Sequence, residues 1–304
     1  MRRLLPLLLV LGLPALAQLR FDVAVGGYAR LLPGGELVAG PRFAGGLEFT
    51  PARGPWRLTV QAYPSWDAPE AHFDPGLARM TVGYAAGTFD VEAGLARHPL
   101  TTAQLLEPYR LPGCGSADDP NGCWSAWVEA LPRIGTGLKL ALLRTDAGDA
   151  GLARANLRWR ELELHLTAVY GPNPTAPAAA GLGASERLGR WIVYGEGWWL
   201  PRADDPARGA LGASTYLGDG LLTLEAGYVD PWTVAGAYSR PIGEDWNLDL
   251  TAGASLAGGE WTPAASGALT YLMSDADLRL GAEGVRLPGV GYAWSLSVDV
   301  RAYY

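Results

Sequence analysis

The chain has 304 residues, of which 49% are apolar, 41 are glycine, 12 are tryptophan and 13 are tyrosine. Its formal net charge of −7 offers no basic surface to nucleic acid, so we expect no nucleic-acid partner. Beyond the N-terminus no apolar run approaches the about 20 residues of a membrane-spanning helix, which excludes an α-helical membrane domain.

The first 17 residues are typical of a secretory signal peptide. Two arginines follow the initiator methionine, an apolar run extends from Leu4 to Leu13, and small residues surround the end at Ala17. A membrane anchor would need a longer apolar run, so we predict cleavage after Ala17. The mature chain, residues 18–304, would then be a single domain.

From residue 19 onward, apolar and polar residues alternate in short segments. "LRFDVAV" (19–25), "TFDVEAGLA" (88–96) and "LELHLTAVY" (162–170) each place large apolar side chains on one face and charged ones on the other. A period of two predicts β-strands, and the Gly-, Pro- and Asp-rich stretches between them predict hairpin turns. Eighteen such segments follow in chain order, near residues 19–32, 37–50, 55–66, 77–86, 88–97, 125–133, 136–145, 152–160, 162–171, 180–188, 190–200, 207–217, 220–229, 232–240, 245–256, 261–272, 276–286 and 291–304.

Two of the eighteen segments are weak candidates for strands. Residues 125–133 contain Pro132, which cannot donate to a strand ladder, and residues 180–188 are rich in small side chains. Without these two, sixteen strands remain and the number stays even. We therefore favour sixteen to eighteen strands, with fourteen as the lower alternative.

Tryptophan and tyrosine residues gather on the apolar faces near segment ends, where amphipathic rings suit the level of lipid headgroups. The last segment, "YAWSLSVDVRAYY" (292–304), has one wholly apolar face and finishes on an aromatic residue. Together with the signal peptide, these features resemble a bacterial outer-membrane β-barrel of the porin-like kind. The resemblance implies an all-β fold, a transmembrane antiparallel up-and-down barrel, because in hydrocarbon every backbone polar group must pair. It also implies the cell outer membrane as location, with outer-membrane lipid and the barrel-assembly machinery as partners. In such proteins the last strand carries a signal for this machinery, and Val298, Val300 and Tyr304 match it.

The longest connection, residues 98–124, contains both cysteines. In an exported chain, Cys114 and Cys123 are predicted to form a disulfide that closes a small loop. We place this loop on the outer side, where it is the best candidate to fold inward and narrow a pore. Asp118 and Asp119 could contribute to a Ca²⁺ site, but a solvated acidic turn is favoured. We predict no metal and no other cofactor.

The polar faces of the strands supply the candidate pore-lining residues. Charges of both signs are interspersed among them, namely Arg57, Arg79, Asp90, Glu92, Arg154, Arg158, Glu163, Glu196, Glu225, Asp249, Arg279 and Glu283. These rows either create a transverse field that selects polar solutes or pair as structural ion pairs. Pairing is favoured for any single residue, above all where the strand carrying Arg158 faces a neighbour carrying Glu163.

These observations predict a water-filled channel for passive diffusion of small hydrophilic solutes, with a homotrimer left open. A plugged barrel with a structural or envelope role is the first alternative, and a soluble β-sandwich is the alternative outside the membrane. A barrel enzyme acting on lipid or peptide is a further alternative, for which His98 near Thr101 or Thr102 is the only hint of a base beside a hydroxyl. We expect no enzymatic activity, because the sequence contains no nucleophile motif and no metal cluster.

Overall fold

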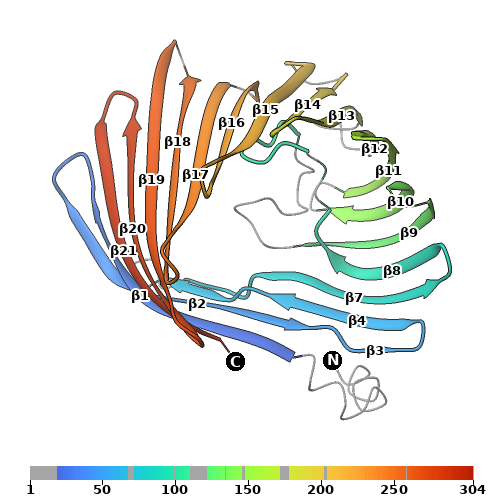
Figure 1. Cartoon of the computed structure of the whole chain (residues 1–304), viewed down its shortest axis with the longest axis horizontal. Coiled ribbons are helices and arrows are strands. Elements are labelled where there is room, and N and C mark those ends of the chain that lie inside the picture. The colour runs from blue at the N-terminus through green and yellow to red at the C-terminus, as the bar shows by residue number, and fades with distance from the viewer. Residues whose placement is uncertain are drawn as a thin grey trace.

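The computed structural model describes residues 19–67, 72–98, 100, 102–109, 122–133, 135–145, 148–171, 178–201, 204–229, 231–257 and 259–303. Every regular element in these ranges is a β-strand (Figure 1). In the same ranges, no helix is long and apolar enough to cross a membrane.

In chain order the strands are β1 (Leu19–Leu31), β2 (Leu37–Phe49), β3 (Ala52–Arg53), β4 (Trp56–Ala62), β5 (Ser65–Asp67), β6 (His72–Asp74), β7 (Leu77–Ala86), β8 (Phe89–Ala96), β9 (Cys123–Arg133), β10 (Thr136–Thr145), β11 (Gly148–Trp159), β12 (Leu162–Tyr170), β13 (Ala178–Leu188), β14 (Trp191–Trp199), β15 (Ala207–Leu217), β16 (Gly220–Tyr228), β17 (Trp232–Ile242), β18 (Trp246–Ala257), β19 (Glu260–Leu272), β20 (Ala276–Leu287) and β21 (Gly291–Tyr303).

The strands form one antiparallel sheet that closes on itself. Each long strand pairs with its neighbours in the chain, and β1 also pairs with β21, in register from Asp22 opposite Tyr303 to Leu31 opposite Trp294. Figure 1 shows the resulting ring of strands around a central opening. Closure removes the edge strands that an open sheet would expose, which is what a sheet must do to cross hydrocarbon.

The barrel wall has eighteen strands, because β3, β5 and β6 are only two or three residues long. Eighteen lies within the favoured range, and the alternative of fourteen is wrong. The two weak segments are both strands of this wall, β9 and β13. Pro132 is accommodated near the end of β9, where the pairing with β10 shifts register between Thr136 and Leu138, so that the missing N–H interrupts the ladder only at the strand end.

The connections differ in length at the two ends of the barrel. Residues 97–122, 171–177 and 200–206 follow β8, β12 and β14, three strands that run in the same direction, so these connections leave from one end, which we call the loop end. At the other end, β7 and β8, β13 and β14, or β15 and β16 are joined by two-residue turns. The connection with the two cysteines, which the sequence analysis placed on the outer side, therefore leaves from the loop end, and longer connections on the outer side are typical of transmembrane barrels.

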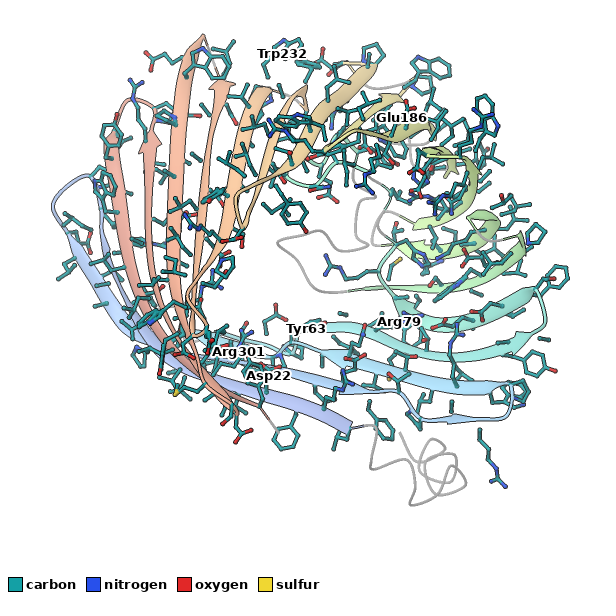
Figure 2. The ribbon with its side chains drawn as sticks, viewed as in Figure 1. Asp22, Tyr63, Arg79, Glu186, Trp232 and Arg301 are labelled. Carbon is teal, nitrogen blue, oxygen red and sulfur yellow. The ribbon has the colours of Figure 1, made fainter. Side chains whose placement is uncertain are left out.

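Aromatic side chains project from the outer face of the wall (Figure 2). Large rings with more than a third of their surface exposed include Trp56, Tyr84, Tyr170, Trp199, Trp232, Trp261 and Trp294. They occupy the apolar parity of their strands, as the alternation predicts. The opposite parity points into the barrel and carries most of the charged residues.

The seam between β1 and the two strands beside it has a close-fitting arrangement. Gly26 of β1 stands opposite Arg42 of β2 on one side and Asp299 of β21 on the other. The Arg42 guanidinium crosses β1 and binds the Asp299 carboxylate through two hydrogen bonds, with 2.6 Å between Nε and Oδ1. A Cβ on Gly26 would collide with Asp299 Oδ1 and the Val298 carbonyl, so the bare glycine makes room for the ion pair.

Candidate functional site

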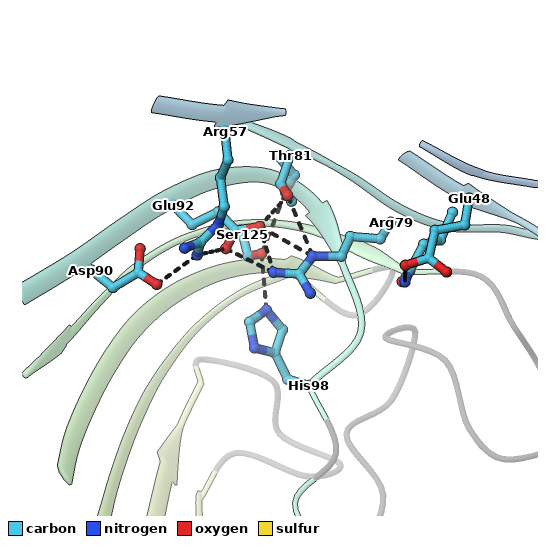
Figure 3. A network of polar contacts seen from close by, with 10 residues as sticks. Glu48, Arg57, Arg79, Thr81, Asp90, Glu92, His98 and Ser125 are labelled. Atoms are coloured by element: carbon cyan, nitrogen blue, oxygen red, sulfur yellow. Dashed lines mark hydrogen bonds and ion pairs between the residues drawn. The ribbon is translucent and has the colours of Figure 1, made fainter. Parts of the chain in front are cut away.

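Arg57 of β4, Arg79 of β7 and two carboxylates of β8 form a network on the inner face (Figure 3). Arg57 Nη2 lies 2.6 Å from Asp90 Oδ2 and 2.7 Å from Glu92 Oε2. Arg79 Nη2 lies 2.6 and 2.7 Å from the two oxygens of Glu92, and Thr81 Oγ1 donates to the same carboxylate. Glu92 is only 1% exposed. The four charged residues expected at the lumen here are brought together as a paired cluster.

A second group lies on β11 and β12. Arg158 Nη1 and Glu163 Oε1 are 3.5 Å apart in directly opposed positions, which is the pairing that the sequence favoured. Further along the same strands, Arg154 Nε lies 3.2 Å and His165 Nδ1 2.8 Å from the side-chain oxygen of Asn156. These residues are less buried than Glu92, and water screens the ion pair.

The candidate pore-lining residues of β18 and β20 are less tightly paired than those around Glu92. Asp249 of β18 accepts hydrogen bonds from Ser239 at 2.6 Å and Asn247 at 3.0 Å. Arg279 and Glu283 of β20 are exposed and form no ion pair within the described ranges. Arg279 lies in a hollow in the inner wall that is lined by charged residues of both signs, among them Arg42, Arg301, Asp277 and Asp299. Its guanidinium is accessible to a solute in the lumen.

The connection after β8 turns inward and runs along the inner wall. Its residues 102–109, which we call the strap, are bonded to β14, β15 and β16 on the wall. Leu106 and Tyr109 of the strap are buried, and the Tyr109 ring stacks on Trp198 of β14 with 4.3 Å between centroids. Burial raises the pKa of Tyr109 to about 12. The expectation that this connection folds inward holds for the strap.

Two candidate pore-lining carboxylates lie beneath the strap. Glu196 of β14 and Glu225 of β16 point inward but are only 7% and 4% exposed. Their oxygens accept hydrogen bonds from Thr102 and from the backbone of residues 104–106. The alternation of side chains along the strands predicts that both carboxylates point inward. It does not predict that the strap covers them, because this depends on how the connection after β8 folds.

The inner wall beside the strap is apolar, which the sequence analysis missed. At the loop end, the inward side chains of β9, β10, β11, β12 and β14 form a buried cluster with Leu100 and Tyr109, comprising among others Trp127, Leu143, Leu152, Val169 and Trp198. The sequence does contain an indication of this apolar inner wall. In "LALL" (140–143) and "AVY" (168–170) the alternation fails at strand ends, and apolar residues on both faces there indicate that something packs inside.

Trp127 also contacts the charged part of the lumen. Lys139 Nζ of β10 lies 4.6 Å from the centre of its ring, and Arg79 Cζ lies 5.8 Å away. Both are within the range of cation–π attraction. The ring therefore links the apolar wall to the network around Glu92.

His98 does not form the pair with Thr102 that an enzymatic barrel suggested. Its Nε2 lies 2.9 Å from Ser125 Oγ, whereas Thr102 contacts Glu196, and Thr101 lies outside the described residues. Burial, helped by nearby cations, lowers the pKa of His98 from 6.5 to about 3. Its Nδ1 is buried without a partner in the described part of the chain.

Several predicted features lie wholly or partly outside the described residues. Cys114, the acidic turn at 118–119, Tyr304 and the signal peptide are among them. Cys123, the first residue of β9, is buried, and no cysteine in the described ranges is free. Val298 and Val300 of the predicted assembly signal project outward from β21 and are about half exposed.

No family model matches this sequence, and no curated protein is similar to it. The fold is similar to that of solved structures of Pseudomonas aeruginosa proteins. OpdL has a TM-score of 0.68 at 10% identity, over 94% of this chain and 98% of its own. The outer membrane protein OpdK, solved with vanillate, has a TM-score of 0.64 at 11% identity, over 95% of this chain and 99% of its own. OccK2 (OpdF), solved with glucuronate, has a TM-score of 0.65 at 12% identity, over 94% and 96%.

Proposed function

We propose that this chain is an outer-membrane channel through which small hydrophilic solutes diffuse passively. The observation that carries the proposal is the closed eighteen-strand wall, which presents exposed aromatic and aliphatic side chains outward and charged side chains inward. A barrel of this size encloses more space than its own side chains fill. The strap narrows that space along one part of the wall.

The proposal extends to solutes that carry a carboxylate. Vanillate and glucuronate, the ligands named for two of the similar structures, are both carboxylates. In this chain the exposed Arg279 forms no ion pair within the described residues, although Asp277 and Asp299 line the same hollow, and guanidinium groups bind carboxylates through paired hydrogen bonds. The geometry of the lumen supports solute passage.

The proposal also includes the maturation steps expected from the sequence. Residues 1–17 would be removed on export, Cys114 and Cys123 would form a disulfide, and the assembly machinery would read Val298, Val300 and Tyr304. Outer-membrane lipid would surround the barrel. A homotrimer is compatible with this arrangement.

The test is a recording in planar lipid bilayers with the mature chain purified in detergent. A channel would produce discrete conductance steps, and a heat-unfolded sample serves as control. A carboxylate such as glucuronate should reduce the ionic current in a concentration-dependent manner, more than its uncharged parent sugar does. An absence of steps from correctly folded protein would favour the plugged barrel instead.

A further inference from the structure

The strap is attached to the wall mainly through two carboxylates. Glu225 of β16 accepts hydrogen bonds from the backbone N–H groups of Gln104, Leu105 and Leu106, at 2.5, 3.0 and 2.7 Å. The Tyr194 hydroxyl donates to the same carboxylate at 2.7 Å. One side chain therefore satisfies three successive backbone donors of a segment that has no regular secondary structure.

Glu196 of β14 holds the beginning of the strap in a similar way. Its Oε2 accepts hydrogen bonds from both the backbone N–H and the hydroxyl of Thr102, the latter at 2.7 Å. Trp198 Nε1 donates to Oε1 at 3.3 Å. Between the two carboxylates, Ser214 of β15 donates to the Gln104 side-chain oxygen at 3.2 Å.

The chemistry of these contacts makes the negative charge essential. Hydrogen bonds from N–H groups to a carboxylate are stronger than neutral ones, and successive N–H groups that converge on one anion form a favourable nest. At Glu225 the strap uses both carboxylate oxygens, so a glutamine there would turn an amide donor toward an N–H group of the strap. At Glu196 both strap contacts go to Oε2, so a glutamine keeps an acceptor for Thr102 but loses the charge and turns its amide donor toward Trp198 Nε1. Either change keeps the shape of the side chain and weakens the attachment, Glu225→Gln more than Glu196→Gln.

We propose that Glu196 and Glu225 are positioning residues that fix the strap inside the channel and thereby set its open width. This inference rests on the proposed channel function and replaces the role of these two residues as solute-contacting groups. Both carboxylates are covered by the strap and act on a solute only through it. Their loss would let the strap leave the wall and fluctuate within the lumen.

Packing of Tyr109 and Leu106 could hold the strap without the carboxylates, so the experiment must separate the two causes. We would record single channels of Glu225→Gln, Glu196→Gln and the double variant. Glu129→Gln is the matched control, because Glu129 of β9 lies opposite Lys139 of β10 and its carboxylate does not touch the strap. Heat-modifiable migration on gels verifies that each variant is a folded barrel, and the single variants carry the test if the double variant does not fold.

The wild-type channel and Glu129→Gln should give steady currents with rare transitions. In Glu225→Gln the ratio of time spent in sublevels to time spent fully open should be about tenfold larger, because a tenfold change in population corresponds to about 1.4 kcal/mol, the scale of one charge-assisted hydrogen bond. The double variant should fluctuate more. Variants as steady as wild type would overturn the inference while leaving the channel itself intact, whereas a wild-type protein without conductance would overturn the channel.

A rescue experiment tests the cause of the fluctuations. Gln104→Cys and Ser214→Cys, introduced together into Glu225→Gln, would be joined by a short thiol cross-linker that ties the strap back to β15. The joined protein should return to steady current, and the same protein before cross-linking should fluctuate. Fluctuations that persist after cross-linking would show that they do not arise from the strap, and the inference would fail.

Discussion

Glu92 is an example of a lumen charge that stabilises the barrel through a buried ion-pair network. Its carboxylate is almost fully buried and is shared by Arg57, Arg79 and Thr81. Removing one partner of a buried ion pair leaves the others uncompensated, which typically costs several kcal/mol. We expect Glu92→Gln to lower the free energy of unfolding by about 3 kcal/mol, measured by denaturant titration in detergent micelles.

The matched control for Glu92 is Glu163, whose contact with Arg158 is long and open to water. Glu163→Gln should lower the free energy of unfolding by less than about 1 kcal/mol, because exposed ion pairs are screened. Equal costs for the two variants would mean that the cluster around Glu92 is not the buried network described above.

His98 gives a prediction about pH. Its pKa is about 3 in the folded protein and 6.5 in an unfolded chain, so between these values the unfolded state binds more protons and stability falls as pH decreases. The melting temperature of the wild type should therefore drop between pH 6.5 and pH 4. In His98→Gln this drop should be smaller, and parallel pH curves for the two proteins would contradict a buried neutral histidine.

At the scale of single residues the sequence predicts position better than role. The inward direction of Glu196 and Glu225 follows from strand parity, because side chains alternate between faces. Their attachment to the strap does not follow, since it depends on contacts between residues about 90 or more positions apart. Trp127 and Trp198 were missed for a related reason: an inward tryptophan contradicts the rule of a polar lumen and makes sense only once an apolar segment packs against it.

At the scale of strands, Gly26 provides the sharpest test of how the barrel closes. Gly26→Ala should push Asp299 away from Arg42 and lower the free energy of unfolding by about 1–3 kcal/mol, the usual cost of overpacking. Gly27→Ala is the control, because a Cβ there would come no closer than 3.4 Å to the Gly40 carbonyl. Denaturant titration of both variants measures the difference, and equal stability would show that the seam tolerates a side chain at Gly26.

The strands themselves were predictable because each obeys a local rule. Period-two alternation located all eighteen, including β13, whose small residues gave a weak pattern, and β9, whose Pro132 falls beside a register shift. Residues 65 and 66 of β5 fall within the strand expected at 55–66, whereas β6 was not predicted. After β4 ends, β5 continues the pairing with β2 and the chain turns back into β6, so that Trp66 pairs with Phe73.

At the scale of the whole molecule, the central claim is that one face of each strand meets lipid while the other meets water in a conducting pore. The strand β21 allows this claim to be tested residue by residue. Leu296 and Val298 project outward and are at least half exposed, whereas Ser295 and Ser297 belong to the inward parity. Positions 295 to 298 therefore alternate between the inner and the outer face of the wall while lying at nearly the same height along the barrel axis.

The most direct measurement is single-channel current during treatment with a negatively charged, membrane-impermeant thiol reagent. Single cysteines would be placed at residues 295, 296, 297 and 298 in a chain whose own two cysteines are replaced by serine. We predict a stepwise fall in current for Ser295→Cys and Ser297→Cys and no change for Leu296→Cys and Val298→Cys. Equal responses at all four positions, or block only at 296 and 298, would contradict the account.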